Sequence, residues 1–310
     1  MLLYNYKNRK MGGTGMSKIG VLLWRKLFES GDAKRLATQI QDLSDLDIQR
    51  DIAYLPDGDQ GHLLDIYRSK TSDMDAPLVI NIHGGGLFAS YKEVNVNFNY
   101  EWARMGYTVV SISYRRIPET TLWHQIDDVM HALRFIRENA DTYGLNLDQC
   151  YLTGDSAGAL LTLFAASING SKKLQREFKI QGSALNIRAL GLVSIMLDTQ
   201  RKDLLRSIND MITCKADKGK AYEKYLRDPA SLLDVTNPLP SILVTSTEDL
   251  IQKDTLKLES VLIRKRAPYE LLNYPKGDTN KLVHVFSVCY PMYPESREVL
   301  SKIDQYFKKT

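Results

Sequence analysis

The chain has 310 residues, 44% of them hydrophobic and 25% charged, an ordinary globular composition with enough apolar residues for a large core. Its 41 basic and 37 acidic residues give a formal net charge of +4 and are mixed along the chain, without the long basic run of a nucleic-acid-binding surface. No uninterrupted apolar run reaches the length of a membrane span, so we expect neither nucleic acid nor a membrane as a partner.

The amino end and the cysteines lead to an expected location. The apolar start Met1–Tyr6 precedes the basic residues of 7–10, whereas a secretory signal carries its charges first and a longer apolar stretch after them. The cysteines Cys150, Cys214 and Cys289 are odd in number and widely spaced, which indicates neither a disulfide framework nor a zinc site. We therefore expect a cytoplasmic protein in a reducing compartment.

In chain order, the first predicted element is a helix over 17–44, where apolar residues recur at helical spacing. Two short runs, 52–54 and 63–67, flank a turn-rich segment and predict a hairpin. Apolar runs then alternate with helical patterns. Strands are expected at 77–83, 107–113, 149–153, 187–195, 241–245 and 269–274, and helices at 126–140, 156–168, 255–266 and 294–307. This alternation predicts an α/β fold with a mostly parallel sheet, helices on both faces and antiparallel strands at one edge.

One mostly polar stretch, 198–238, interrupts the alternation. Its length and composition suit an insertion at the carboxyl ends of the strands, where open α/β sheets bind ligands. We predict a single domain over 1–310 with a helical cap formed by 16–47 and 198–238. For the first of these segments, helical periodicity is equally compatible with a helix packed on the body of the domain.

The strongest motif is G-x-S-x-G at Gly154–Gly158, between a predicted strand and a predicted helix. A sharp turn of this kind forces the central serine into a strained conformation, and the glycines on either side avoid clashes. The turn would present the Ser156 hydroxyl at a helix amino end, whose partial positive charge favours a developing anion. Ser156 is therefore the candidate nucleophile.

A second motif, HGGG at His83–Gly86, follows a predicted buried strand. Attack on an ester carbonyl produces an oxyanion, which needs backbone N–H donors held in place beforehand. We expect these donors from Gly85, Gly86 and Ala157, because an HGGG segment pairs with the residue after the nucleophile. His83 itself is expected to hold the loop by hydrogen bonds.

A serine nucleophile needs a base, and the base needs an orienting carboxylate. The chain order for this motif is serine, acid, histidine, and His284 alone of the five histidines follows Ser156. Asp249 directly follows the predicted strand 241–245 and is the preferred acid. Glu248 and Asp254 are its rivals; Asp254 lies further along and would suit a bracing role.

With these motifs in place, residues 51–310 resemble the hormone-sensitive-lipase-like branch of the α/β-hydrolase carboxylesterases. The resemblance also covers three shorter segments, Tyr114-Arg115, Pro118-Glu119 and Asp127-Asp128. It implies an α/β-hydrolase fold, with catalytic roles for Ser156, Asp249 and His284 and oxyanion roles for Gly85, Gly86 and Ala157. Two departures concern the acyl pocket and the acid: Leu87 follows the triple glycine where the family has an aromatic residue, and Asp249-Leu-Ile replaces Asp-Pro-Leu.

The expected activity is hydrolysis of small carboxylic esters with short acyl chains, acetyl to hexanoyl, through an acyl-enzyme and without a metal or organic cofactor. Two alternatives stay open: an amidase or peptidase with the same triad, and a ligand-binding homologue without turnover. The sequence also leaves open whether the chain forms a homodimer.

Overall fold

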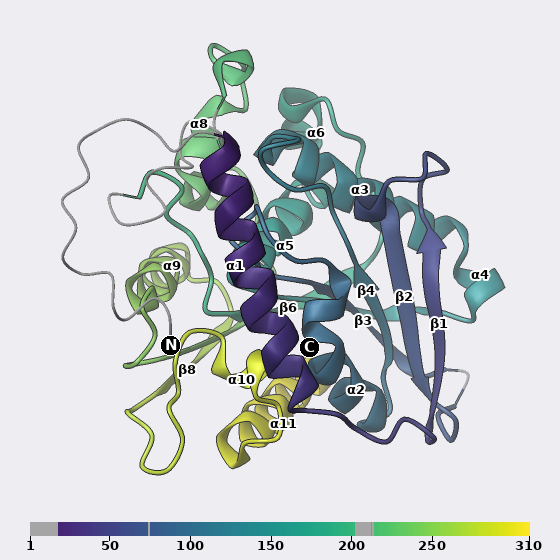
Figure 1. The fold of residues 1–310 in the computed structure, drawn as a ribbon. Helices are drawn as coiled ribbons and strands as arrows, with labels where there is room; N and C mark the ends of the chain where they lie inside the picture. Colours follow the sequence, from purple (N-terminus) through teal and green to yellow (C-terminus); the bar gives the residue numbers. More distant parts are fainter. Residues whose placement is uncertain (1–17, 74, 202–211, 213) are drawn as a thin grey trace.

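Eight strands form one sheet in the computed structural model, which describes residues 18–73, 75–201, 212 and 214–310 (Figure 1). In spatial order these are β1 (Leu46–Ala53), β2 (Leu63–Ser69), β4 (Thr108–Ile112), β3 (Pro77–Ile82), β5 (Asn146–Asp155), β6 (Ile187–Val193), β7 (Ser241–Ser246) and β8 (Tyr269–Tyr274). Strand β2 runs antiparallel to both of its neighbours, and all the other pairs are parallel. The predicted α/β fold, with its antiparallel edge, is confirmed.

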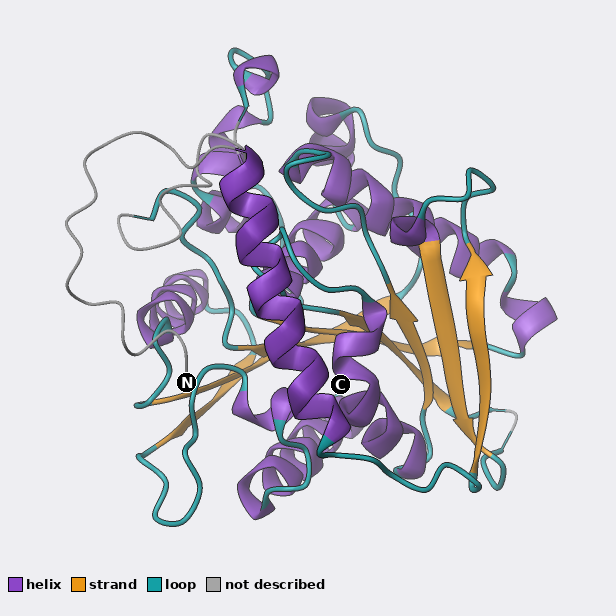
Figure 2. Cartoon of the chain, viewed as in Figure 1, coloured by secondary structure: helices purple, strands orange, loops and turns teal. Residues whose placement is uncertain are grey.

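Helices cover both faces of this sheet (Figure 2). The helices are α1 (Lys18–Ala37), α2 (Val96–Arg104), α3 (Leu122–Glu138), α4 (Ala140–Tyr143), α5 (Ala157–Asn169), α6 (Lys172–Phe178), α8 (Glu223–Arg227), α9 (Gln252–Lys265), α10 (Phe286–Cys289) and α11 (Pro294–Lys309). Short 3-10 turns lie at η2 (Gln60–His62), η3 (Lys92–Asn95), η5 (Lys215–Asp217) and η6 (Pro229–Asp234).

The strand period of two divides the core between the two faces. In β3, Leu78 and Ile80 belong to a cluster that includes α3, α5 and α9, whereas Val79 belongs to a second cluster with α2 and α11. Both faces of the strand are therefore buried, which explains why Leu78, Val79 and Ile80 are apolar in succession rather than alternating with polar residues.

The first helix ends earlier than predicted, at Ala37 instead of residue 44. Beyond it, the Asp42 side chain accepts from the backbone N–H and the hydroxyl of Ser44, a local turn that competes with helical bonding. Ile40, which contributed to the predicted pattern, is 88% exposed, so no packing holds a helix there.

Helix α1 lies across the front of the view in Figure 1, over loops that follow β3 and β4. The later segment of the predicted cap contains η5, α8 and η6, while 16–17, 202–211 and 213 lie outside the described residues. A cap made of these two segments stays a prediction. A helix with both the length and the apolar character of a membrane span is absent from the part of the chain that the structure describes.

Candidate active site

Ser156 occupies a strained turn between β5 and α5, with φ 51° and ψ −116°. The left-handed φ is unfavourable for a residue with a Cβ, and surrounding contacts must hold it. The Ser156 N–H donates to the Val193 carbonyl at 2.8 Å, and its own carbonyl accepts from the Met196 N–H at 3.1 Å. The turn is thus fixed to the end of β6 and the residues just after it.

The two glycines of the motif are required by close packing. A Cβ on Gly158 would lie 2.0 Å from the Ile82 carbonyl oxygen, and a Cβ on Gly154 would lie 2.6 Å from the Thr162 hydroxyl. The Ile82 oxygen is a backbone atom, and a Cβ on Gly154 would also lie 2.7 Å from backbone atoms of Gly158, so rotation of a side chain cannot relieve either contact. The first turn of α5 can therefore approach β3 only because it carries no side chain at Gly158.

The structure brings Ser156, His284 and Asp249 into one hydrogen-bonded chain. His284 follows β8 in a loop just before α10, and its Nε2 lies 2.9 Å from the Ser156 Oγ. Its Nδ1 lies 2.8 Å from Oδ1 of Asp249, which follows β7. Both loops leave the carboxyl ends of parallel strands, which is why residues so distant in the sequence meet at this edge.

Asp249 is held as a carboxylate. Burial alone would raise its pKa, but the hydrogen bond and charge of His284, with bonds from the Ile251 N–H and the Ser194 hydroxyl, outweigh burial and hold the pKa below its usual range. The Thr245 hydroxyl also donates to Oδ2 at 3.1 Å. A carboxylate so placed can orient an imidazole and stabilise its protonated form.

The sequence analysis missed Ser194, at the end of β6. Its hydroxyl helps to lower the pKa of Asp249 and accepts from the Val285 N–H at 3.2 Å, so it lies between the acid and the histidine loop. Ser194 and Val285 both have positive φ, 49° and 53°, which is costly for a β-branched valine. No local motif marks this contact, because its partners are far apart in the sequence.

The rival acids have other partners. Glu248 accepts from the backbone N–H groups of Leu282 at 2.9 Å and Gly277 at 3.3 Å, in the loop that leads to the histidine. Asp254 accepts from the Asp198 N–H at 2.8 Å and from Arg201 at 2.9 Å, which matches the bracing role suggested for it. The structure brings neither carboxylate to a ring nitrogen of His284.

Among the backbone N–H groups without an acceptor in the described residues are those of Gly85, Gly86 and Ala157. Ala157 is the first residue of α5, where an N–H has no partner within the helix. Gly85 and Gly86 have φ of 117° and 62°. A Cβ on Gly85 would lie 2.2 Å from the Ala89 carbonyl oxygen. Unpaired donors of this kind can stabilise an oxyanion.

Side chains from β5, from η3 and from the loop after β4 hold the glycine loop. The Asp155 carboxylate accepts from the Gly84 N–H at 3.0 Å and from the Asn95 side chain at 2.7 Å. The His83 ring stacks on Tyr114 at 4.3 Å, and its Nδ1 lies 2.6 Å from the Gly84 carbonyl oxygen. Burial lowers the pKa of His83 to about 3, so the ring is neutral and Nδ1 carries the proton that it donates.

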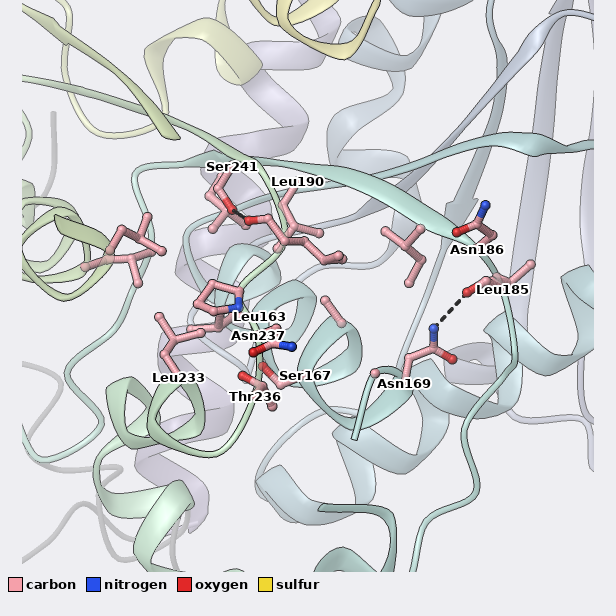
Figure 3. A pocket seen from close by; sticks show the side chains of 18 of the residues that line it. Leu163, Ser167, Asn169, Leu185, Asn186, Leu190, Leu233, Thr236, Asn237 and Ser241 are labelled. Carbon is pink, nitrogen blue, oxygen red and sulfur yellow. Dashed lines mark hydrogen bonds between the residues drawn. The ribbon is translucent and has the colours of Figure 1, made fainter. Parts of the chain in front are cut away.

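Among the described residues, no group of three or more His, Cys, Asp or Glu side chains is arranged to hold a metal ion. The structure also contains a cavity that lies away from Ser156. This cavity, of about 310 Å³, is lined by leucines and amide side chains at the amino ends of β6 and β7, including Asn169 and Leu185 (Figure 3). It lies at the carboxyl end of α5, whereas Ser156 lies at the amino end of that helix.

The mixed sheet with an antiparallel edge and the strand–serine–helix turn define the class of α/β-hydrolases. The BD-FAE family model matches residues 64–220, just over half of the chain. The chain therefore belongs to the BD-FAE family.

Curated relatives and solved structures agree with this class. The chain is 33% identical over 142 residues to esterase LipQ of Mycobacterium tuberculosis, covering 45% of this chain and 34% of the relative. It is 28% identical over 131 residues to isoprenylcysteine alpha-carbonyl methylesterase ICME of Arabidopsis thaliana, covering 42% of this chain and 30% of the relative. The chain thus spans about a third of the length of these relatives.

Among solved structures, esterase B of Lactobacillus rhamnosis has a TM-score of 0.87 at 25% identity, covering 93% of both chains. The same esterase inhibited by a C4-C4 tributyrin phosphonate has a TM-score of 0.85, also at 25% identity, covering 93% of this chain and 94% of that one. These matches confirm the expected resemblance to the hormone-sensitive-lipase-like branch of the α/β-hydrolase carboxylesterases.

Proposed function

We propose that this protein is a serine carboxylesterase that hydrolyses short-chain esters through an acyl-enzyme on Ser156. The observation that carries the proposal is the hydrogen-bonded chain from Asp249 through His284 to the Ser156 hydroxyl, with distances of 2.8 Å and 2.9 Å. Nucleophile, base and orienting acid in hydrogen-bond contact are what activation of a serine hydroxyl requires.

In the first half of the proposed reaction, the Ser156 oxygen attacks the ester carbonyl carbon while His284 Nε2 takes the hydroxyl proton. The carbonyl oxygen becomes an oxyanion, which accepts hydrogen bonds from the N–H groups of Gly85, Gly86 and Ala157. His284 then gives its proton to the leaving alcohol, and the acyl group stays on the serine as an ester.

In the second half, a water molecule replaces the alcohol. His284 takes a proton from the water, whose oxygen attacks the acyl-enzyme, and the same backbone donors stabilise the second oxyanion. Collapse of this intermediate releases the carboxylic acid and returns the proton to Ser156. Asp249 stays ionised throughout and stabilises the imidazolium that forms twice in each cycle.

The proposed substrates are small carboxylic esters with acyl groups from acetyl to roughly hexanoyl. Support comes from the structurally similar esterase B, which was solved with a C4-C4 tributyrin phosphonate. We further propose that α1 and the second segment, 198–238, form a cap, since α1 contacts the loop that carries the oxyanion donors. The proposed location is the cytoplasm, in keeping with three free cysteines.

The test is hydrolysis of p-nitrophenyl acetate, butyrate and octanoate by the wild type and by Ser156→Ala, with folding checked by circular dichroism. We expect turnover that falls toward octanoate and disappears in the folded variant. Faster turnover of long-chain emulsified triglyceride would refute the proposed acyl preference. Cleavage of anilides but not esters would favour the amidase alternative. A folded wild type without turnover, and without labelling by a fluorophosphonate, would favour ligand binding.

A further inference from the structure

Helix α1 buries an arginine. Among its twenty residues, only Val21 and Arg25 are buried, and Arg25 is 7% exposed. A buried guanidinium is costly to desolvate unless its donors are paired. The partners of Arg25 therefore indicate why a charge lies on this face.

The hydrogen bonds and the ion pair of Arg25 in the described structure are all with two loops at the candidate active site. Its Nε donates to the Phe88 carbonyl at 2.6 Å, and its Nη2 donates to the Ile117 carbonyl at 2.6 Å. The same guanidinium pairs with the Glu119 carboxylate, at 2.8 Å and 2.6 Å. The hydrogen bond from Arg25 in turn holds the pKa of Glu119 below its usual range. One side chain thus joins α1 to the loops after β3 and β4.

The Phe88 carbonyl belongs to the turn that begins with the oxyanion glycines. The N–H groups of Phe88 and Ala89 donate back to the Gly85 carbonyl at 3.2 Å and 2.9 Å. The turn is also tied to the second loop, because the Ile117 N–H donates to the Leu87 carbonyl at 3.0 Å. Arg25 therefore bonds on both sides of this tie, to the carbonyl of Ile117 itself and to that of Phe88, the residue after Leu87.

An aromatic contact reinforces the same turn. Phe28, one helical turn after Arg25, packs edge-on against Phe88 with ring centroids 5.3 Å apart. The Phe88 ring in turn lies against Gly86, where an added Cβ would come within 2.7 Å of it. The helix thus contacts the oxyanion turn through a side-chain ring as well as through hydrogen bonds.

From these contacts we propose that Arg25 is a positioning residue for the oxyanion hole, which fixes the Gly85–Ala89 turn through the Phe88 and Ile117 carbonyls. The inference rests on the proposed function. A planar guanidinium suits this role because its donors point in fixed directions and reach two carbonyls and a carboxylate together. A lysine ammonium lacks this fork and cannot reproduce the geometry.

Loss of this support should affect the transition state more than the bound ester, because the oxyanion forms only during reaction. Misplacement by about 1 Å can cost on the order of 100-fold in rate. We therefore expect Arg25→Met to lower kcat about 10- to 100-fold while KM changes less than about threefold. Arg25→Lys should give an intermediate loss of kcat.

The experiment measures kcat and KM on p-nitrophenyl butyrate and on its thiono analogue, in which sulfur replaces the carbonyl oxygen. Sulfur accepts hydrogen bonds weakly, so the ratio of oxo-ester to thiono-ester rates reports on the oxyanion hole. Arg35→Met is the matched control, since Arg35 bonds from the same helix to the carbonyls of Val94 and Cys289. We expect a lower ratio in both Arg25 variants and an unchanged ratio in Arg35→Met.

Three results would overturn the inference. In an enzyme that depends on Ser156, an unchanged kcat and rate ratio in both Arg25 variants would exclude the positioning role and leave the proposed function intact. Equal loss in Arg35→Met would show general loosening of α1 instead. A wild type whose activity survives Ser156→Ala would overturn the proposed function and the role of Arg25 with it. If Arg25→Met does not fold, Arg25→Lys and Glu119→Gln carry the same comparison.

Discussion

Replacing Asp249 with asparagine removes the negative charge of the orienting acid and keeps its shape. In the structure, Oδ1 accepts from His284 Nδ1 at 2.8 Å and from the Ile251 N–H at 3.0 Å, while Oδ2 accepts from the Thr245 hydroxyl. The Ile251 N–H is fixed in the backbone and needs an acceptor, which an amide NH2 group cannot be. The Thr245 hydroxyl can rotate and accept from that NH2 group instead. The amide oxygen of Asp249→Asn should therefore replace Oδ1, so that His284 keeps its Nδ1–H tautomer.

The expected loss then comes from the missing charge alone. Two unit charges about 4 Å apart interact by about 4 kcal/mol at an effective dielectric constant of about 20, and a neutral hydrogen bond retains part of this stabilisation. A net loss of about 2–4 kcal/mol corresponds to roughly a 30- to 1,000-fold fall in kcat. An amide turned the other way would force the wrong tautomer, at a cost of about 10,000-fold.

The assay is kcat on p-nitrophenyl butyrate for purified wild type and Asp249→Asn, with matching circular dichroism spectra. Asp254→Asn is the control, because this carboxylate is bonded to the Asp198 N–H and to Arg201 rather than to the histidine. We expect the control to keep kcat within about threefold of the wild type. A loss of kcat below about threefold in Asp249→Asn would refute the assignment of Asp249 as the acid. A loss near 10,000-fold would refute the prediction that the Ile251 N–H keeps the amide oxygen turned toward His284.

Two further predictions concern stability, and each is measured by urea unfolding. Gly158→Ala should lose about 1–3 kcal/mol or more, because its Cβ would meet the Ile82 carbonyl at 2.0 Å, whereas Gly170→Ala, with 3.5 Å to its nearest atom, should change little. Equal stability of the two variants would contradict the packing argument. His62→Gln should cost more stability at pH 6 than at pH 9. Burial alone would lower the pKa of His62, but its carboxylate partners, Asp128 first, raise it. The attraction between protonated His62 and these carboxylates therefore stabilises the folded protein fully below pH 6.5, the ordinary pKa of histidine. This stabilisation is lost as the pH rises through the raised pKa of His62. An equal loss at both pH values would exclude this linkage.

The fold and the Ser156 turn could be predicted because their signals are local. The inner strands β3, β4 and β6 are mostly apolar and almost wholly buried, and the glycines of the nucleophile turn are imposed by close backbone contacts. His284 followed from chain order alone, and the structure places it beside Ser156. The choice of Asp249 over Glu248 rested on its place after a strand, and the structure pairs Asp249 with the histidine.

Arg25 and Ser194 could not be found this way. Arg25 contacts residues 63 and 92 positions away, and Ser194 contacts Val285, 91 positions away. Neither belongs to a periodic pattern or a motif, so only the three-dimensional arrangement identifies them. The end of α1 was missed for a related reason. Ile40 continues the apolar pattern, but no part of the described structure packs against it strongly enough to extend the helix.

The central claim is that Ser156 carries the acyl group, and the most direct measurement is to locate a covalent adduct. The wild type would be treated with diethyl p-nitrophenyl phosphate, which reacts with activated serines, and its peptides analysed by tandem mass spectrometry. The account predicts one phosphoryl group per chain, located on Ser156, and loss of esterase activity in proportion to labelling. An active enzyme whose label lies on another residue, or whose activity is unaffected when Ser156 is labelled, would contradict it.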